Sequence, residues 1–228
     1  MRKRLFTDFD GPIMDVSERY FQVYKFCLKQ TKLAGQTVTP LSKREFWALK
    51  RAQVNEKDIA LKSGLVEPGQ AEQFAQLRRS TVHTDSYFKH DLIIEGAIAA
   101  LEKAQDAGIE LAVMTMRRER ELLPVLHQYN LTRFFPSERR FYLSNDYVKT
   151  GDTKDKPKLM KRAIATLPKA DRQWIVGDTE ADIEAGKQHG VSTIGILSGI
   201  RNETQLRLQN PDAIEPHLID AIELAIAS

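Results

Sequence analysis

The feature that most constrains the fold of this chain is the alternation of short apolar, strand-like runs with helical patterns. The strand-like runs lie at residues 4–7, 110–115, 173–177 and 191–197. Between several of them, apolar residues recur every three or four positions, as on one face of a helix. The run Trp174-Ile175-Val176 is continuously apolar, which is typical of a strand buried on both faces. The alternation predicts an α/β fold, a doubly wound parallel sheet with helices on both faces.

Residues 16–92 interrupt this alternation. Helical patterns occupy residues 20–31, 43–52 and 70–81, and no convincing strand lies between them. A segment of this length with its own helical periodicity is better explained as a domain than as a loop. The sequence therefore predicts a core made of residues 1–15 and 93–228, with an all-helical domain inserted as residues 16–92.

Composition excludes several classes of protein. The 34 basic residues nearly balance the 31 acidic ones, and a net charge of +3 gives no reason to expect binding to nucleic acid or a membrane. The single cysteine, Cys27, rules out an internal disulfide and a CxxC metal site. No apolar run approaches the ~18 residues that a membrane helix needs. We therefore expect a cytoplasmic protein, and no feature predicts its oligomeric state.

Polar side chains follow three of the expected strands. Asp8 and Asp10 come directly after the first, Thr115 ends the second, and Asp178 follows the third, with Asp182 on the next helix. The carboxyl ends of parallel strands meet at one edge of the sheet, where ligands bind. Clustered carboxylates repel one another unless a cation neutralises them, and no arginine is expected among them. Oxygen ligands favour Mg²⁺, so we predict a magnesium site.

A lysine adds a second kind of ligand to this group. Lys156 precedes Pro157, a residue that suits the first turn of a helix. A lysine ammonium and a threonine hydroxyl both suit a phosphate group. Lys154 and Lys158 flank Lys156, and the residue pattern alone does not choose among the three.

Taken in order, these motifs resemble the haloacid dehalogenase (HAD) superfamily, in particular its phosphoglycolate phosphatase and β-phosphoglucomutase-like members. The signature of that superfamily is DxDG, then a Thr or Ser, then a Lys, then GDxxxD. In this chain it matches Asp8-Phe9-Asp10-Gly11, Thr115, Lys156 and Gly177-Asp178-Thr179-Glu180-Ala181-Asp182. The resemblance covers essentially the whole chain, with residues 16–92 in the place of a helical cap. It favours Lys156 over its neighbours, because proline follows the lysine in the family pattern.

The resemblance implies a phosphatase that acts on a small phosphorylated metabolite. Asp8 would be the nucleophile that forms an aspartyl-phosphate, and Asp10 would be the general acid and base. Thr115 and Lys156 would hold the phosphoryl oxygens. Mg²⁺ would be bound by Asp8, the backbone carbonyl of Asp10, Asp178 and Asp182. The helical insertion would be a mobile lid over the site.

Two departures from the family pattern leave alternatives open. Pro12 follows DxDG where the family usually has Thr or Val, and Met116 follows Thr115 where a small or amide residue is usual. Because of these departures, a weakly active regulatory or phosphate-binding protein of the same fold is one alternative. A phosphomutase would use the same core residues, and a phosphonate hydrolase would need a lysine from the insertion. A dehalogenase is disfavoured, because that chemistry lacks the second acid that this chain keeps at Asp10.

The basic run Arg117-Arg118-Glu119-Arg120 is expected to be solvated surface. Arg117 lies close enough to Thr115 in the sequence that contact with a substrate stays open.

Overall fold

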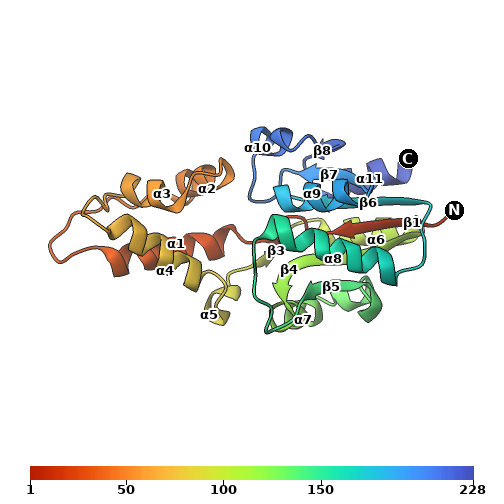
Figure 1. Cartoon of the computed structure of the whole chain (residues 1–228), viewed down its shortest axis with the longest axis horizontal. Helices are drawn as coiled ribbons and strands as arrows, with labels where there is room; N and C mark the ends of the chain where they lie inside the picture. The colour runs from red at the N-terminus through yellow and green to blue at the C-terminus, as the bar shows by residue number, and fades with distance from the viewer. The chain divides into compact units, whose positions relative to one another are not determined.

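The computed structural model describes residues 1–228, and its main element is a six-stranded sheet in the order β5-β4-β1-β6-β7-β8 (Figure 1). The strands are β1 (Lys3–Thr7), β4 (Ile109–Arg118), β5 (Arg140–Leu143), β6 (Arg172–Gly177), β7 (Ser192–Ile196) and β8 (Ala213–Glu215). Every pairing in this sheet is parallel. The predicted α/β fold class is confirmed.

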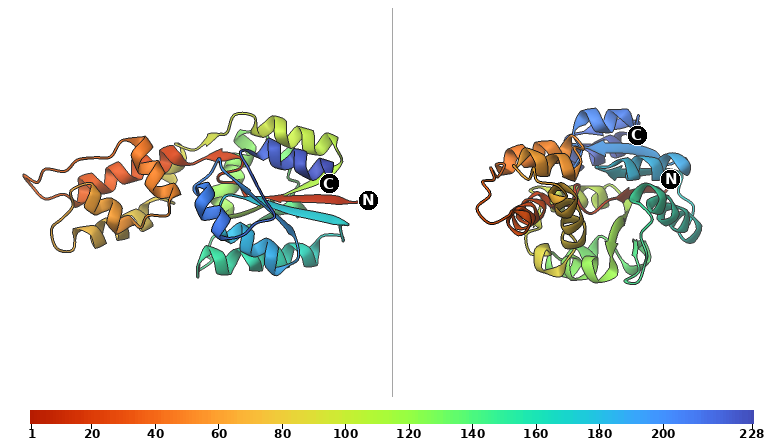
Figure 2. Two further views of the ribbon diagram at one scale, coloured as in Figure 1. Left: turned by 90° about the horizontal axis from the view of Figure 1, so that it is seen from above. Right: turned by 60° about the vertical axis from the view of Figure 1, so that its left-hand side comes forward.

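Helices cover both faces of this sheet. α6 (Ala97–Asp106) and α11 (Leu218–Ala227) pack together on one face, and α8 (Asp152–Thr166) and α9 (Glu180–Gln188) on the other (Figure 2). The remaining helices of the sheet unit are α7 (Glu119–Gln128), α10 (Glu203–Leu208), η1 (Leu131–Arg133) and η2 (Ser137–Arg139). Helices on both faces require the buried parts of the middle strands to be apolar, which explains the runs Leu111–Met114 in β4 and Trp174–Val176 in β6.

β1 lies at the centre of the sheet, between β4 and β6. Leu5 pairs with Leu111 on one side and Trp174 on the other, and its side chain is fully buried. The chain adds β4 and β5 on one side of β1 and then crosses over to add β6, β7 and β8 on the other. In open α/β sheets a crevice for ligands forms at such a reversal, outside the carboxyl ends of the strands. The residues that follow β1 and β6 therefore lie where a ligand is expected to bind.

Residues Val16–Leu92 form a second compact unit, and the first comprises Met1–Asp15 and Ile93–Ser228. The helices of this helical unit are α1 (Ser17–Thr31), α2 (Lys43–Arg51), α3 (Glu56–Lys62), α4 (Gln70–Thr81) and α5 (Asp85–Phe88). Tyr24 is fully buried at its centre, and its ring stacks on Phe46 with ring centroids 4.7 Å apart. Cys27 is buried in the same core, and burial raises the pKa of its thiol to about 12. It packs as a small hydrophobic residue.

The chain enters and leaves the helical unit through two very short strands. β2 (Met14–Asp15) and β3 (Leu92–Ile93) form a two-stranded sheet of their own. Just beyond β3, the Ile94 N–H donates to the carbonyl of Ile13 at 2.9 Å. The two crossings are therefore hydrogen-bonded to each other.

Several elements differ from the sequence prediction. The edge strands β5 and β8 were not predicted, because they have only four and three residues and each carries a charged side chain. β4 was expected to end at Thr115 but continues to Arg118. The short helix α3 was also missed, although Asn55 caps it by accepting a hydrogen bond from the Asp58 N–H at 3.0 Å. Short elements give too few residues for a periodic pattern to stand out.

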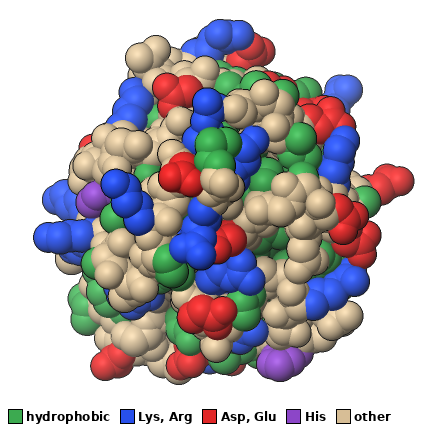
Figure 3. Space-filling view, turned by 90° about the vertical axis from the view of Figure 1, so that its right-hand side faces the viewer, with side chains coloured by type: hydrophobic (Ala, Val, Ile, Leu, Met, Phe, Trp, Pro, Cys, Tyr) green, Lys and Arg blue, Asp and Glu red, His purple; other side chains and the backbone are tan.

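None of the helices combines the length and the apolar character that crossing a bilayer requires. On the face drawn in Figure 3, Lys and Arg side chains are intermixed with Asp and Glu rather than gathered in one patch.

Candidate active site

Asp8 is the first residue after β1. Its N–H donates to the carbonyl of Val176 at 2.8 Å, which extends the pairing with β6 one step past the end of β1. The side chain is held at both oxygens. Oδ1 accepts from the N–H of Phe9 at 2.7 Å, and Oδ2 lies 2.6 Å from Nζ of Lys156. The end of the central strand thus presents a buried, oriented carboxylate.

The turn that follows Asp8 requires glycine at position 11. Gly11 has φ +95°, and a Cβ on it would lie 2.4 Å from Cγ of Asp178. The hydroxyl of Ser198, from the loop after β7, donates to the Gly11 carbonyl at 2.7 Å. The turn therefore packs directly against a second acid of the site.

Asp178 follows β6 and is held by the loop after β7. Its Oδ2 accepts from the N–H of Ile200 at 2.6 Å, and a Cβ at Gly199 would lie 1.9 Å from the same oxygen. Arg201 fixes this loop by donating to both oxygens of Glu180 at 2.9 and 2.8 Å. These loop residues were missed in the sequence, because they act through backbone groups and through the absence of a side chain.

Asp182 stands in the first turn of α9 and is fully buried. Its Oδ2 accepts from the N–H and the hydroxyl of Thr179, at 3.1 and 2.7 Å, in a capping box. Its Oδ1 lies 2.5 Å from Nζ of Lys156. Gly177 leaves room for this arrangement, because a Cβ there would lie 1.9 Å from Cγ of Asp182. Asp182 therefore links the start of the helix to the lysine of the site.

Of the three neighbouring lysines, the structure brings Lys156 to the site. Its side chain is 1% exposed and contacts both Asp8 and Asp182, whereas Lys158 is exposed and pairs with Asp155. The expectation that Pro157 lies in the first turn of its helix was wrong. α8 already begins at Asp152, so Pro157 falls in the second turn.

Asp155 orders the loop that leads into α8. It accepts from the N–H of Thr150 at 2.7 Å, the N–H of Gly151 at 3.2 Å and the hydroxyl of Tyr147 at 2.9 Å. Burial alone would raise the pKa of Asp155, but hydrogen bonds from Lys158 and Thr150 hold it below its usual value. The carboxylate next to Lys156 thus fixes the helix start from which Lys156 projects.

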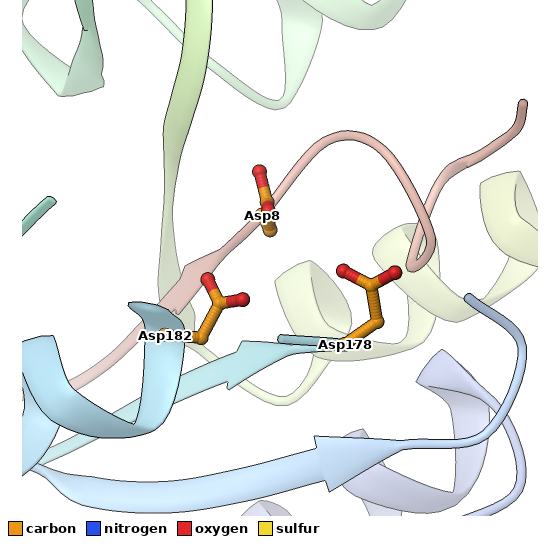
Figure 4. Close-up of side chains that lie close together, drawn as sticks. All are labelled: Asp8, Asp178 and Asp182. Atoms are coloured by element: carbon orange, nitrogen blue, oxygen red, sulfur yellow. The ribbon is translucent and has the colours of Figure 1, made fainter. Parts of the chain in front are cut away.

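Asp8, Asp178 and Asp182 form a buried acidic triad (Figure 4). Each offers an oxygen, and these oxygens all lie within 4.8 Å of one another. Burial raises the pKa of Asp8 to about 7, although Lys156 acts in the opposite direction. Burial and the nearby Asp8 carboxylate raise the pKa of Asp178 well above its usual value. Burial would lower the pKa of Lys156, but Asp182 and Asp8 outweigh it and raise the pKa.

This charge balance fits a divalent cation. Three buried carboxylates and one ammonium leave two negative charges in excess when all four groups are ionised. All donors are oxygens, which suit a hard cation. Both oxygens of Asp182 already have partners in Thr179 and Lys156. Asp8 and Asp178 are therefore the side chains best placed to hold the ion.

Thr115 is 2% exposed and lies within β4 rather than at its end. Between Met114 and Arg118, β4 advances four residues, while its partner β5 advances only two, from Phe141 to Leu143. The extra residues bulge out of the regular pairing, and bulges of this kind re-aim side chains near active sites. The N–H of Arg117 donates to Oγ1 of Thr115 at 3.2 Å across this bulge.

The bulge turns Arg117 inward, which corrects two expectations. Arg117 is 3% exposed rather than solvated surface. Its Nε and Nη2 lie 2.8 and 2.6 Å from Oδ1 of Asp10, so one of the clustered acids does have an arginine partner. Asp10 stands outside the acidic triad, and its side chain is 26% exposed. The pairing depends on the register of β4 against β5, which the sequence pattern does not reveal.

Comparison with known proteins shows the family of this chain. The sequence profile of the haloacid dehalogenase-like hydrolases matches residues 5–196, and the chain belongs to that family. The matched range contains all the residues of the site predicted from the sequence, from Asp8 to Asp182. The fold and site therefore define a HAD-type hydrolase.

Individual relatives carry phosphatase names. The chain is 30% identical over 190 residues to a phosphoglycolate phosphatase of Agrobacterium fabrum, covering 81% of this chain and 70% of the relative. It is 26% identical over 125 residues to a phosphoglycolate phosphatase of Pseudomonas syringae pv. tomato, covering 54% of this chain. The match spans only 44% of that relative's length, less than half. The crystal structure of a predicted phosphatase from Clostridium acetobutylicum superposes with a TM-score of 0.70 at 17% identity over 100% of both chains, which shows a shared fold.

Proposed function

We propose that the protein is a Mg²⁺-dependent phosphatase that hydrolyses a small phosphorylated metabolite through an aspartyl-phosphate on Asp8. The observation that carries the proposal is the buried acidic triad around Lys156 at the carboxyl ends of β1 and β6. The phosphatase names of the relatives in Agrobacterium and Pseudomonas support the same reaction class.

In the first half of the proposed reaction, a carboxylate oxygen of Asp8 attacks phosphorus. The bond from phosphorus to the leaving oxygen breaks, and Asp10 gives that oxygen a proton. Lys156 and Thr115 hold the phosphoryl oxygens in line, since phosphoryl transfer depends mainly on positioning and positive charge. Mg²⁺, held by Asp8, Asp178 and the backbone carbonyl of Asp10, would supply the positive charge that neutralises these oxygens and the carboxylates around them.

In the second half, the proton moves the other way. Asp10 takes a proton from a water molecule, and the resulting hydroxide attacks the phosphorus of the aspartyl-phosphate. The bond between phosphorus and Asp8 breaks, which releases phosphate and restores the Asp8 carboxylate. The Phe9 N–H and Lys156, which hold the two oxygens of Asp8, keep the carboxylate oriented for the next cycle.

We assign the choice of substrate to the helical unit, in the role of a lid. The chain passes into and out of this unit only at β2 and β3, two crossings of two residues each, a connection suited to a hinge. Replacing residues 16–92 by those of a relative should change which phosphate ester is preferred while phosphorylation of Asp8 continues. Unchanged preference would refute the assignment.

The proposed function is tested by phosphate release from p-nitrophenyl phosphate and from a panel of phosphorylated metabolites. We expect turnover with Mg²⁺, none after exhaustive chelation, and poor replacement by Ca²⁺, whose coordination shell is larger and looser. Asp8→Asn is the control for a contaminating phosphatase. Full activity after chelation would refute the metal requirement. Return of the phosphoryl group to a sugar rather than to water would identify a phosphomutase instead.

A further inference from the structure

We infer that Arg117 is a positioning residue that acts through Asp10, holding its Oδ1 so that the proton transferred in catalysis travels on Oδ2. The inference rests on the proposed function, in which Asp10 is the acid and base. It concerns a residue of a basic run that the sequence assigned to the solvated surface, with contact between Arg117 and a substrate left open.

The first observation is the geometry of the pair. Nε and Nη2 of Arg117 lie 2.8 and 2.6 Å from the same atom, Oδ1 of Asp10. An oxygen that accepts from two guanidinium N–H groups is a poor place for a proton. The proton that Asp10 gives to the leaving oxygen, and later takes from water, is therefore carried on Oδ2.

The second observation is that Arg117 is itself fixed. Its side chain is 2% exposed, and its guanidinium lies 5.1 Å from the centre of the Phe9 ring. Nη1 lies within 3.4 Å of the Glu121 carbonyl at the start of α7, and the Arg117 N–H is bonded to Thr115. A rigid planar donor held on several sides can set the orientation of a partner carboxylate, whereas a flexible surface arginine cannot.

The third observation is that Arg117 lies in the bulge of β4 together with Thr115. In regular pairing the segment after Met114 would advance in step with β5, but here it takes two residues more than its partner. Those additional residues place Thr115 and Arg117 in the same short bulge. One local irregularity thus delivers the phosphate-binding hydroxyl of the proposed function and the partner of its acid and base.

The test compares two phosphate esters that differ in how much their leaving oxygen needs a proton. p-Nitrophenyl phosphate needs little protonation to release its phenolate, while phenyl phosphate, which lacks only the nitro group, has a far more basic leaving oxygen. If Arg117 acts through Asp10, Arg117→Met should lower kcat/KM for phenyl phosphate by at least about tenfold more than for p-nitrophenyl phosphate. Arg117→Lys keeps the charge but loses the fork, and we expect a smaller loss with the same substrate dependence. Arg120→Met removes an exposed arginine of the same run and should change neither rate.

A double-mutant cycle completes the test. In the Asp10→Asn background, Arg117→Met should change kcat/KM for either ester by less than about twofold, because the group it acts through is gone. Equal losses for both esters that persist in that background would overturn the inference and assign Arg117 to phosphate binding. No loss in either ester from a folded Arg117→Met protein would also overturn it, and thermal unfolding establishes that the variant is folded. Failure of the proposed function is distinct, because wild type would then release no phosphate or Asp8→Asn would release it at the wild-type rate.

Discussion

Replacing Asp178 by asparagine should stabilise the metal-free protein while it abolishes the response to Mg²⁺. The carboxylate of Asp178 has oxygens within 4.8 Å of two other buried acids, and burial together with Asp8 raises its pKa well above the usual value. Asparagine has the same shape, and its carbonyl oxygen can still accept from the Ile200 N–H that now donates at 2.6 Å. The substitution therefore removes a charge and keeps the hydrogen bond.

The size of the effect follows from Coulomb's law. Two unit charges 4.8 Å apart interact by about 3.5 kcal/mol at an effective dielectric constant of about 20. Asp178 is repelled by two carboxylates and attracted by one ammonium, so roughly one repulsive pair remains. Solvent and relaxation of the site relieve some of this repulsion, and we expect a gain of about 2 kcal/mol in the free energy of unfolding. For a chain of this size that corresponds to a rise in Tm of roughly 4–8 °C.

The assay is thermal unfolding at pH 8, with chelator and with Mg²⁺. Wild type should gain about 2.7 kcal/mol when Mg²⁺ is present at about 100 times its dissociation constant, and Asp178→Asn should gain almost nothing. Asp155→Asn is the matched control, because Asp155 is also buried but accepts hydrogen bonds from several donors. The Asp155→Asn substitution should destabilise the protein by about 1–3 kcal/mol, whereas Asp178→Asn should stabilise it. A lower Tm for Asp178→Asn in chelator, or a full response to Mg²⁺, would refute the reasoning.

Three further predictions concern the same site. Lys156→Met should destabilise the protein by about 3–5 kcal/mol in urea unfolding, because it leaves Asp8 and Asp182 buried without their cation; a loss below about 1 kcal/mol would contradict this. Gly199→Ala should lower kcat/KM by roughly 10²-fold with little change in circular dichroism, since its Cβ would displace the Asp178 carboxylate; unchanged kinetics would show that the loop can yield. In chelator, the contribution of Asp8 to stability should fall as pH rises from about 4 to 7, because its pKa is raised to about 7 in the folded state and the unfolded chain releases that proton at a lower pH. In Asp8→Asn this part of the slope of Tm against pH should vanish. A slope equal to that of wild type would contradict the assignment.

The sequence predicts the parts of this molecule that depend on strong local patterns. β6 stands out through the continuous apolar run Trp174-Ile175-Val176, which is typical of a strand buried on both faces, and β1 through the fully buried pair Leu5 and Phe6. The acids Asp8 and Asp178 stand out for the opposite reason, since each is a charge placed directly after such a strand. Together these patterns predict the α/β sheet and which of its edges holds the polar groups.

What the sequence does not predict depends on register and on backbone atoms. Arg117 reaches Asp10 only because β4 bulges against β5, and β5 is too short to show a periodic pattern in the sequence. The loop after β7 holds Asp178 through the N–H of Ile200 and through the missing side chain of Gly199, and neither has a chemical signature in the sequence. Contacts of this kind become visible only when the chain is folded in three dimensions.

The measurement that tests the central claim most directly is the intact mass of Asp8→Asn and Asp10→Asn after mixing with p-nitrophenyl phosphate and Mg²⁺. Asp10→Asn should lose roughly 10²–10⁴-fold in turnover, because only proton transfer is removed. It should retain more activity on this activated ester than on alkyl phosphates, and it should accumulate one phosphoryl group per chain, since water activation is also lost. Asp8→Asn should show neither turnover nor added mass, because an amide cannot form the acyl-phosphate. Robust turnover by Asp8→Asn, or a phosphoryl group on that variant, would contradict the account.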